Sequence, residues 1–310
     1  NDFLWMDRFT IQNLELLDSN RENGNTLLKV LDNTVSPMGS RMIKRWLMFP
    51  LQDIRKIDER LNTTEFFIKN QDVKQALTQL IKQIGDIERI VAKIPLRKIS
   101  PREVLQLAKG LQAIVEVKEL TKNCGDTWIL RLSEQLNPCH LIKDKITKTL
   151  IENPPALANK GGLIAPNIQA ELDNLRKISS NSKEFLLQIQ QREIEITGIP
   201  SLKISFNNVF GYYLEVTNTH KHKVPDTWIR KQTLANAERY ITPELKEYEQ
   251  KIMGAEEKIL LLEMQIYDAL LLELQEYITP IQLNANLIAQ LDCITCFASN
   301  AMQFKYRRPQ

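Results

Sequence analysis

Two long helical patterns, separated by a short segment of a different kind, constrain the fold of this chain most strongly. The first pattern runs from about residue 168 to 197 and ends at Gly198-Ile199-Pro200, a helix stop. The second begins at Thr242-Pro243-Glu244, which supplies an N-cap, a first-turn proline and an early carboxylate, and it continues to about Tyr277. At a rise of 1.5 Å per residue, the helices would be roughly 45 and 50 Å long. We expect them to pair antiparallel and to bracket the segment between them.

The bracketed segment has the period of β-strands. Apolar residues occupy every second position on both sides of Asn207-Asn208, from Leu202 to Phe206 and from Phe210 to Val216. A three-residue loop, 207–209, pairs Phe206 with Phe210 and keeps all of these side chains on one face, whereas a two-residue loop does not. The sequence therefore predicts a small β-rich module at the end of a helical pair.

The remainder of the chain has helical periodicity. Residues 27–150 read as successive amphipathic helices, with starts at Ser36-Pro37 and Ser100-Pro101, and residues 152–167 form a connector rich in proline and glycine. We expect a mainly α fold, in which a multi-helical body carries the small β-rich insert on two long antiparallel helices. The expected domains are residues 1–199, the insert 200–242, and residues 243–310, which return to the body.

The charge of the chain is concentrated in the insert. The whole chain has 41 Lys+Arg against 38 Asp+Glu, a surplus of three, so affinity for nucleic acid must come from clustering. Residues 200–242 alone hold six basic residues against three acidic ones, again a surplus of three. Arginine, lysine, asparagine and glutamine side chains commonly hold phosphate backbones, and "RKQTLANAER" (230–239) supplies all four. A solvated surface without a ligand is the competing interpretation of the same residues.

Other motifs carry little chemistry. His220 and His222 could form half of a metal site, but the third histidine, His140, lies far away in sequence, so we predict no metal. Cys293 and Cys296 lie within a helical pattern, which favours buried structural cysteines over redox or zinc chemistry. Phosphate-binding, nucleophile-elbow and zinc-protease motifs do not occur in the sequence. We therefore expect no enzymatic activity from this segment, and nuclease activity is the least favoured interpretation.

The sequence also bears on location. It contains no run of eighteen apolar residues and no signal-peptide pattern, so we expect a cytoplasmic protein without a membrane partner. Four cysteines in a chain of 310 residues do not form a disulfide framework, in agreement with a reducing compartment.

Five segments together closely resemble the MutS family of DNA mismatch-repair proteins, and its bacterial branch in particular. Their order and spacing match the family over nearly the entire chain, and they are "LDNTVSPMGSRMIKRWL" (31–47), "IGDIERIVAKI" (84–94), "ELDNLRK" (171–177), "TGIPSLKISFNNVFGYYLEV" (197–216) and "RKQTLANAERYITPELKEYEQKI" (230–252). The resemblance implies that the chain is the middle lever (core) region of such a protein, and that its insert is the DNA-binding clamp.

In that family, the complete protein is a homodimer and a DNA-dependent ATPase that uses ATP and Mg. Its clamps close on double-stranded DNA, ATP binding moves the levers, and MutL is recruited afterwards. By resemblance, the mismatch-reading and ATPase domains lie outside this chain, which itself needs no cofactor. Two alternatives remain open: a helical module that binds a protein partner, and a MutS relative that acts on recombination junctions.

The resemblance also suggests DNA-binding residues. Arg230, Lys231, Gln232, Asn236 and Arg239 match the DNA-facing motif of the clamp. Lys203, Lys221, His222 and Lys223 lie on flanking clamp segments. The family usually has a lysine where this chain has Ala235, which removes one phosphate contact. Arg239, which stands beside Glu238 and the start of a helix, has the alternative role of bracing the hinge.

Overall fold

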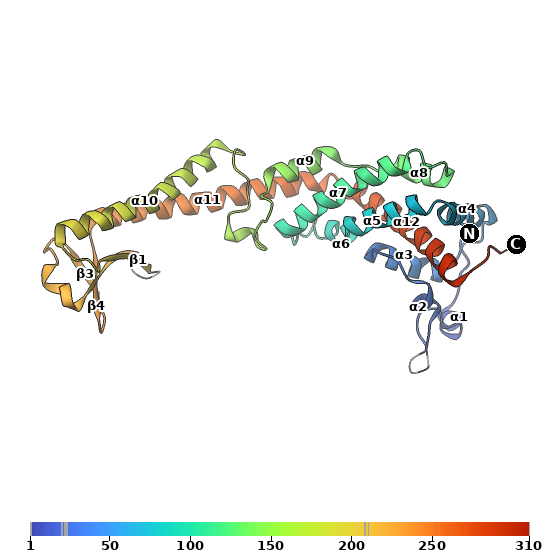
Figure 1. Cartoon of the computed structure of the whole chain (residues 1–310), viewed down its shortest axis with the longest axis horizontal. Coiled ribbons are helices and arrows are strands. Elements are labelled where there is room, and N and C mark those ends of the chain that lie inside the picture. The colour runs from blue at the N-terminus through green and yellow to red at the C-terminus, as the bar shows by residue number, and fades with distance from the viewer. Residues whose placement is uncertain (1, 20, 22–23, 208, 210, 310) are drawn as a thin grey trace. The chain divides into compact units, whose positions relative to one another are not determined.

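The computed structural model describes residues 2–19, 21, 24–207, 209 and 211–309, which divide into two compact units (Figure 1). The first unit comprises Asn1–Leu157 and Asp268–Gln310, and the second comprises Ala158–Tyr267. Helix α11 (Pro243–Gln275) contributes residues to both units. The expected division into residues 1–199, 200–242 and 243–310 follows sequence patterns rather than compactness, and it stays a prediction.

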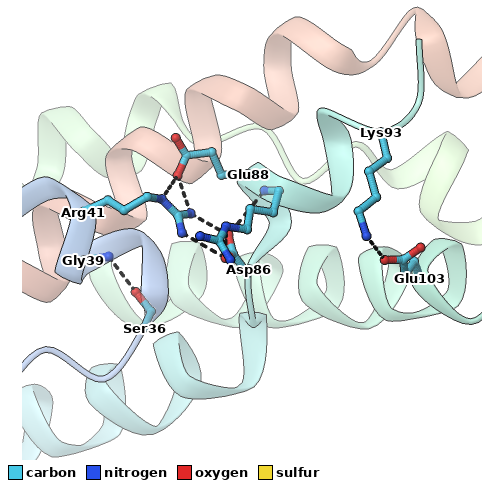
Figure 2. Close-up of polar contacts among 8 residues, drawn as sticks. Ser36, Gly39, Arg41, Asp86, Glu88, Lys93 and Glu103 are labelled. Carbon is cyan, nitrogen blue, oxygen red and sulfur yellow. Dashed lines mark hydrogen bonds and ion pairs between the residues drawn. The ribbon is translucent and has the colours of Figure 1, made fainter. Parts of the chain in front are cut away.

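The first unit is built from helices, as the periodicity of residues 27–150 predicts. Besides the end of α11, they are α1 (Arg8–Asn13), α2 (Leu27–Leu31), α3 (Pro37–Met48), α4 (Ile54–Lys69), α5 (Gln71–Ile84), α6 (Ile87–Val91), α7 (Pro101–Thr121), α8 (Thr127–Gln135), α9 (His140–Thr149) and α12 (Ile278–Phe304). Both predicted serine caps are present. The Ser36 hydroxyl accepts the Gly39 N–H at 3.0 Å (Figure 2), and Ser100 forms a capping box with Glu103.

Helix α12 supplies much of the core of the first unit and packs against α3 and α4. Cys293 and Cys296 are buried beside Ile43. Burial raises the pKa of both thiols, that of Cys296 to about 11, so neither is poised as a thiolate at neutral pH. The prediction of buried structural cysteines is confirmed.

A buried carboxylate on α12 fixes the start of α3. Asp292 accepts the N–H groups of Val35 at 3.0 Å and Ser36 at 2.8 Å, and its Oδ2 also accepts the Ser36 hydroxyl at 2.6 Å. Burial raises the pKa of this carboxyl, although the hydrogen bonds oppose the shift. Asp292 therefore joins the turn before α3 to the core.

In the second unit, α10 (Ala170–Thr197) and the first part of α11 lie side by side and antiparallel (Figure 1). Along the pair, the Phe185 and Tyr248 rings stack with centroids 3.9 Å apart, and Arg192 contacts Glu244 at 2.5 Å. The bounds agree with the predicted helices, 168–197 and 243–277, to within two residues. Gly198, with a φ of 62°, ends α10 as the sequence predicts.

A second buried carboxylate attaches the connector before α10 to this helical pair. Glu263 accepts the N–H of Gly162 at 2.5 Å and forms an ion pair of 2.6 Å with Arg176. Arg176 also donates to the Ile164 carbonyl at 2.7 Å. The connector includes the short 3-10 helix η1 (Ala158–Lys160).

The insert forms a four-stranded antiparallel sheet, in the order β1-β2-β4-β3, at the end of the helical pair (Figure 1). Its elements are β1 (Lys203–Asn207), β2 (Gly211–Thr217), the 3-10 helix η2 (Asn218–Lys223), β3 (Ile229–Thr233) and β4 (Ala237–Ile241). Leu202, Leu214, Val216 and Tyr240 are buried with Ile199, Leu245 and Ile252 in one core that joins the sheet to the helices. The predicted small β-rich module between two long helices is confirmed.

The predicted register of the first hairpin is wrong by two residues. The structure pairs Ile204 with Leu214 and Phe206 with Tyr212, whereas we expected Ile204 to pair with Tyr212. A shift of two residues leaves every side chain on the same face, so alternation could not distinguish the registers. The expected partner of Phe206, Phe210, lies outside the described residues, as does Asn208 in the predicted turn.

A contact from α11 fixes the observed register. Gly211 begins β2 opposite Asn207 with a φ of 75°, and a β-carbon there would lie 2.1 Å from a carboxylate oxygen of Glu249. The same carboxylate accepts the Tyr212 N–H at 3.0 Å. The left-handed conformation favours glycine here, and a β-carbon would also displace the Glu249 carboxylate from its contact with the Tyr212 N–H.

Candidate nucleic-acid interface

A row of polar side chains crosses the face of the sheet opposite to the core. Lys203 on β1 pairs with Glu215 on β2, Glu215 with Arg239 on β4, and Arg239 with Gln232 on β3. Residues that are directly paired in this way share a face of the sheet. The row therefore brings together three of the predicted site residues, Lys203, Gln232 and Arg239.

Arg239 is held inside this row. Its Nε donates to Glu215 at 3.0 Å and its Nη1 to the Gln232 side-chain oxygen at 2.9 Å. The guanidinium also lies 4.3 Å from the centre of the Tyr213 ring, and only 18% of the side chain is exposed. These contacts brace β2, β4 and β3 against one another and leave Arg239 less available to a ligand than the neighbouring cations.

A β-bulge in β3 interrupts the alternation of side chains at the cation Lys231. Arg230 pairs with Tyr240, but Gln232 pairs with the adjacent Arg239, so Lys231 is the extra residue between them. Bulges redirect side chains locally. Lys231 is exposed, and within the described part of the chain its side chain has neither a hydrogen bond nor an ion pair.

Two further cations converge on one buried carboxylate. A carboxylate oxygen of Glu238 lies 2.5 Å from Lys221 Nζ and 3.5 Å from Arg230 Nη1, although Glu238 itself is almost fully buried. The Tyr240 hydroxyl donates to its other oxygen. Lys221 and Arg230 remain 51% and 60% exposed, so Glu238 fixes one side of each cation and leaves the rest in water.

The pKa values follow from these contacts. Hydrogen bonds from Lys221 and Tyr240 lower the pKa of Glu238. Burial, and then the bond to Glu238, raise the pKa of Tyr240 to about 12. Glu238 therefore stays ionised at neutral pH and holds its two cationic neighbours in place.

Sequence reasoning missed this role of Glu238, which it counted only as one of the acidic residues. The register of β4 shows the inward position, because residues 238 and 240 fall on the face that carries Leu214 and Val216. A carboxylate at an inward position of a strand requires partners, since an unpaired buried charge is costly.

The other predicted residues lie around η2 and the turn between β3 and β4. Lys223 Nζ donates to the Gly198 carbonyl at 3.0 Å, so it caps the end of α10. His222 is exposed, and Asn236 is an exposed residue of the turn whose carbonyl accepts the Asn218 N–H at 3.1 Å. Ala235, at the position where a lysine was expected, is also exposed.

The described residues hold neither a candidate metal cluster nor a membrane-spanning helix. Among them, no group of three or more histidine, cysteine, aspartate or glutamate side chains could hold a metal ion, and this includes the surroundings of His220 and His222. No described helix has both the length and the apolar character needed to cross a bilayer.

Comparisons with known proteins agree with the motifs. Residues 9–298 match the family model of MutS domain III. The chain is 54%, 53% and 52% identical to proteins named DNA mismatch repair protein MutS from Parabacteroides distasonis, Phocaeicola vulgatus and Bacteroides thetaiotaomicron. Each comparison covers 99% of this chain and 35% or 36% of the relative, so the chain spans about a third of the length of these curated relatives. The chain therefore belongs to the MutS family of DNA mismatch-repair proteins and corresponds to its domain III.

Proposed function

We propose that residues 200–242 form a clamp that binds the backbone of double-stranded DNA without reading its sequence. The observation that carries this proposal is the arrangement of Lys221 and Arg230 on the buried Glu238, beside Lys231, which is exposed and has no partner among the described residues. A rigid strand and a buried counter-charge hold these cations before DNA arrives, so little side-chain entropy remains to be lost on binding. Phosphates are the same in every sequence, so contacts of this kind carry no base specificity.

Within this proposal, the predicted residues contribute differently. Lys221, Arg230 and Lys231 contact phosphates, and the exposed His222 and Asn236 contribute near them. Lys203 contacts phosphate from the opposite face of the sheet, on the other edge strand. Gln232 and Arg239 hold the sheet in shape, and Lys223 fixes the module to α10. This assignment rests on exposure and on the contacts that each side chain already makes.

In the complete protein, the long helices transmit motion to the clamp. α11 is one continuous helix of 33 residues, and two ion pairs and a ring stack join it to α10. Such a pair moves as a stiff element, which suits the lever role that the family resemblance suggests. ATP and Mg, a homodimer and recruitment of MutL belong to this proposal for the complete protein.

The proposal is tested by the binding of a labelled linear duplex, measured by fluorescence anisotropy. Lys203→Glu/Lys231→Glu should weaken binding strongly, because it reverses one exposed cation on each edge strand of the sheet, β1 and β3. Lys98→Glu/Lys109→Glu changes the net charge equally at exposed positions of the first unit and should have a small effect. If both double variants lose the same affinity, the clamp assignment fails.

Two further measurements test the alternative functions, a protein-binding module and a role at recombination junctions. A protein-binding module would give binding that changes little with salt, whereas phosphate binding must fall steeply. A four-way junction that binds much more tightly than the linear duplex would favour a role at recombination junctions.

A further inference from the structure

Two arginines of the first unit line a pocket that holds no anionic side chain. The pocket has a volume of about 400 Å³ and lies among residues of α3, α4 and α12. Arg45 and Arg60 line it together with the aromatic side chains of Phe3, Trp46 and Phe49 and with amide groups from α12. Among the described residues that line it, none carries a carboxylate, so the pocket combines positive charge with an aromatic wall.

The geometry of Arg60 shows which part of its guanidinium is free. Its Cζ lies 3.5 Å from the centre of the Trp46 ring, so the flat face of the guanidinium is stacked on the indole. Stacking occupies the face and leaves the N–H groups at the edge, and in the described part of the chain the Arg60 side chain makes no hydrogen bond or ion pair. Burial lowers the pKa of Arg60 to about 10, the direction expected for a cation without an anionic partner.

A third arginine nearby provides the contrast. Arg41 stands one helical turn before Arg45 on α3, and its guanidinium contacts Asp86 at 2.6 Å and Glu88 at 2.5 Å (Figure 2). These carboxylates raise the pKa of Arg41. Among the described residues, Arg45 makes no ion pair or hydrogen bond of this kind, so it differs from Arg41 in having no carboxylate partner.

We propose that this pocket binds a second polypeptide, through a short segment that presents a carboxylate beside an apolar side chain. The carboxylate accepts two parallel hydrogen bonds from the free edge of Arg60, with Arg45 beside it. The neighbouring apolar side chain packs on the aromatic wall. Arginine and tryptophan are also the residues in which the binding energy of protein interfaces concentrates.

The surrounding charges favour a peptide over a nucleic acid. A phosphate backbone needs a row of free cations along its path. The charged residues that line this pocket are Arg45 and Arg60, beside an aromatic wall. Two adjacent cations next to apolar rings suit a single carboxylate with an apolar neighbour better than a row of phosphates.

The test uses the whole 310-residue chain and two synthetic pentapeptides, Leu-Asp-Phe-Asp-Leu and its amide analogue Leu-Asn-Phe-Asn-Leu, both with blocked ends. Binding is followed by NMR through the indole N–H signal of Trp46, which is identified with Trp46→Phe. The acidic peptide should shift this signal saturably, and the amide analogue should bind at least roughly tenfold more weakly, because it lacks charge-assisted bonds.

Variants of the two lining arginines show whether the peptide binds in this pocket. Arg45→Gln and Arg60→Lys should each lower the affinity for the acidic peptide by roughly tenfold. Arg60→Lys keeps the positive charge, in case a neutral residue at this position prevents folding. Arg131→Gln, at an exposed arginine paired with Glu59, should leave the affinity unchanged. The proposal is overturned if both peptides bind equally, if neither shifts the signal at millimolar concentration, or if inorganic phosphate or duplex DNA displaces the acidic peptide.

Discussion

Replacing Lys231 and Arg239 separately tests the proposed distinction between cations that contact DNA and cations that hold the β-rich insert together. Lys231→Ala removes an exposed charge that has no partner in the described part of the chain. One lost phosphate contact lowers the slope of log affinity against log salt by about 0.9. Extrapolated from 1 M to 0.1 M salt, that slope amounts to about eightfold in affinity, or about 1.2 kcal/mol. The variant should keep the unfolding free energy of the parent chain.

Arg239→Ala should lower the unfolding free energy and leave the salt dependence of DNA binding unchanged. It removes bonds of 3.0 Å to Glu215 and 2.9 Å to Gln232 from a side chain that is mostly buried. Hydrogen bonds of charged groups contribute roughly 1.5–3 kcal/mol, so we expect a loss of roughly 2 kcal/mol in unfolding free energy. Because Arg239 already has partners, the salt slope should stay unchanged wherever the protein remains folded.

Fluorescence anisotropy across a salt series and urea unfolding measure the two effects, with Lys98→Ala as the control for charge. If Lys231→Ala keeps the full slope of log affinity against log salt, Lys231 does not contact a phosphate. If Arg239→Ala reduces that slope by about 0.9 without any loss of stability, the structural role of Arg239 is refuted.

Three further predictions concern stability and titration. Gly211→Ala should destabilise the second unit by roughly 1–2 kcal/mol in urea unfolding, because a φ of 75° strains residues other than glycine. An unchanged midpoint would contradict the preference for glycine at this position. Asp292→Ala should cost about 3 kcal/mol or more, since it leaves the N–H groups of Val35 and Ser36 without partners, and a loss below about 1 kcal/mol would argue against that role. Glu238 has a lowered pKa, so its stabilising contribution is present above its ordinary value of 4.5 and is lost as pH falls through the lowered value; thermal unfolding of Glu238→Gln should lack this acid-dependent component.

The sequence predicts the helices of this fold well because their signals are local. Pro37 and Pro101 at helix starts and Gly198 at a helix end act within one turn, and the observed bounds follow them closely. The register of the first hairpin could not be predicted in the same way. Two registers satisfy the alternation equally, and Glu249, distant in sequence, contributes the contact that favours one of them.

The candidate site shows the same difference between local signals, which the sequence contains, and contacts between distant residues, which it does not. Composition and family motifs identify the basic insert, and the structure brings Lys221 and Arg230 to Glu238 across three elements. Neither that convergence nor the bulge at Lys231 has a signal in any short stretch of sequence. The difference between exposed cations and the braced Arg239 likewise depends on pairing across strands, which composition does not contain.

The most direct test of backbone binding by the clamp is a salt series with matched and singly mismatched duplexes of equal length. We predict equal affinity for the two duplexes and a slope of about −2.7 or steeper, which corresponds to at least three phosphate contacts. A clear preference for the mismatched duplex, a slope near zero, or no binding at low salt would contradict a clamp that holds DNA by its phosphates alone.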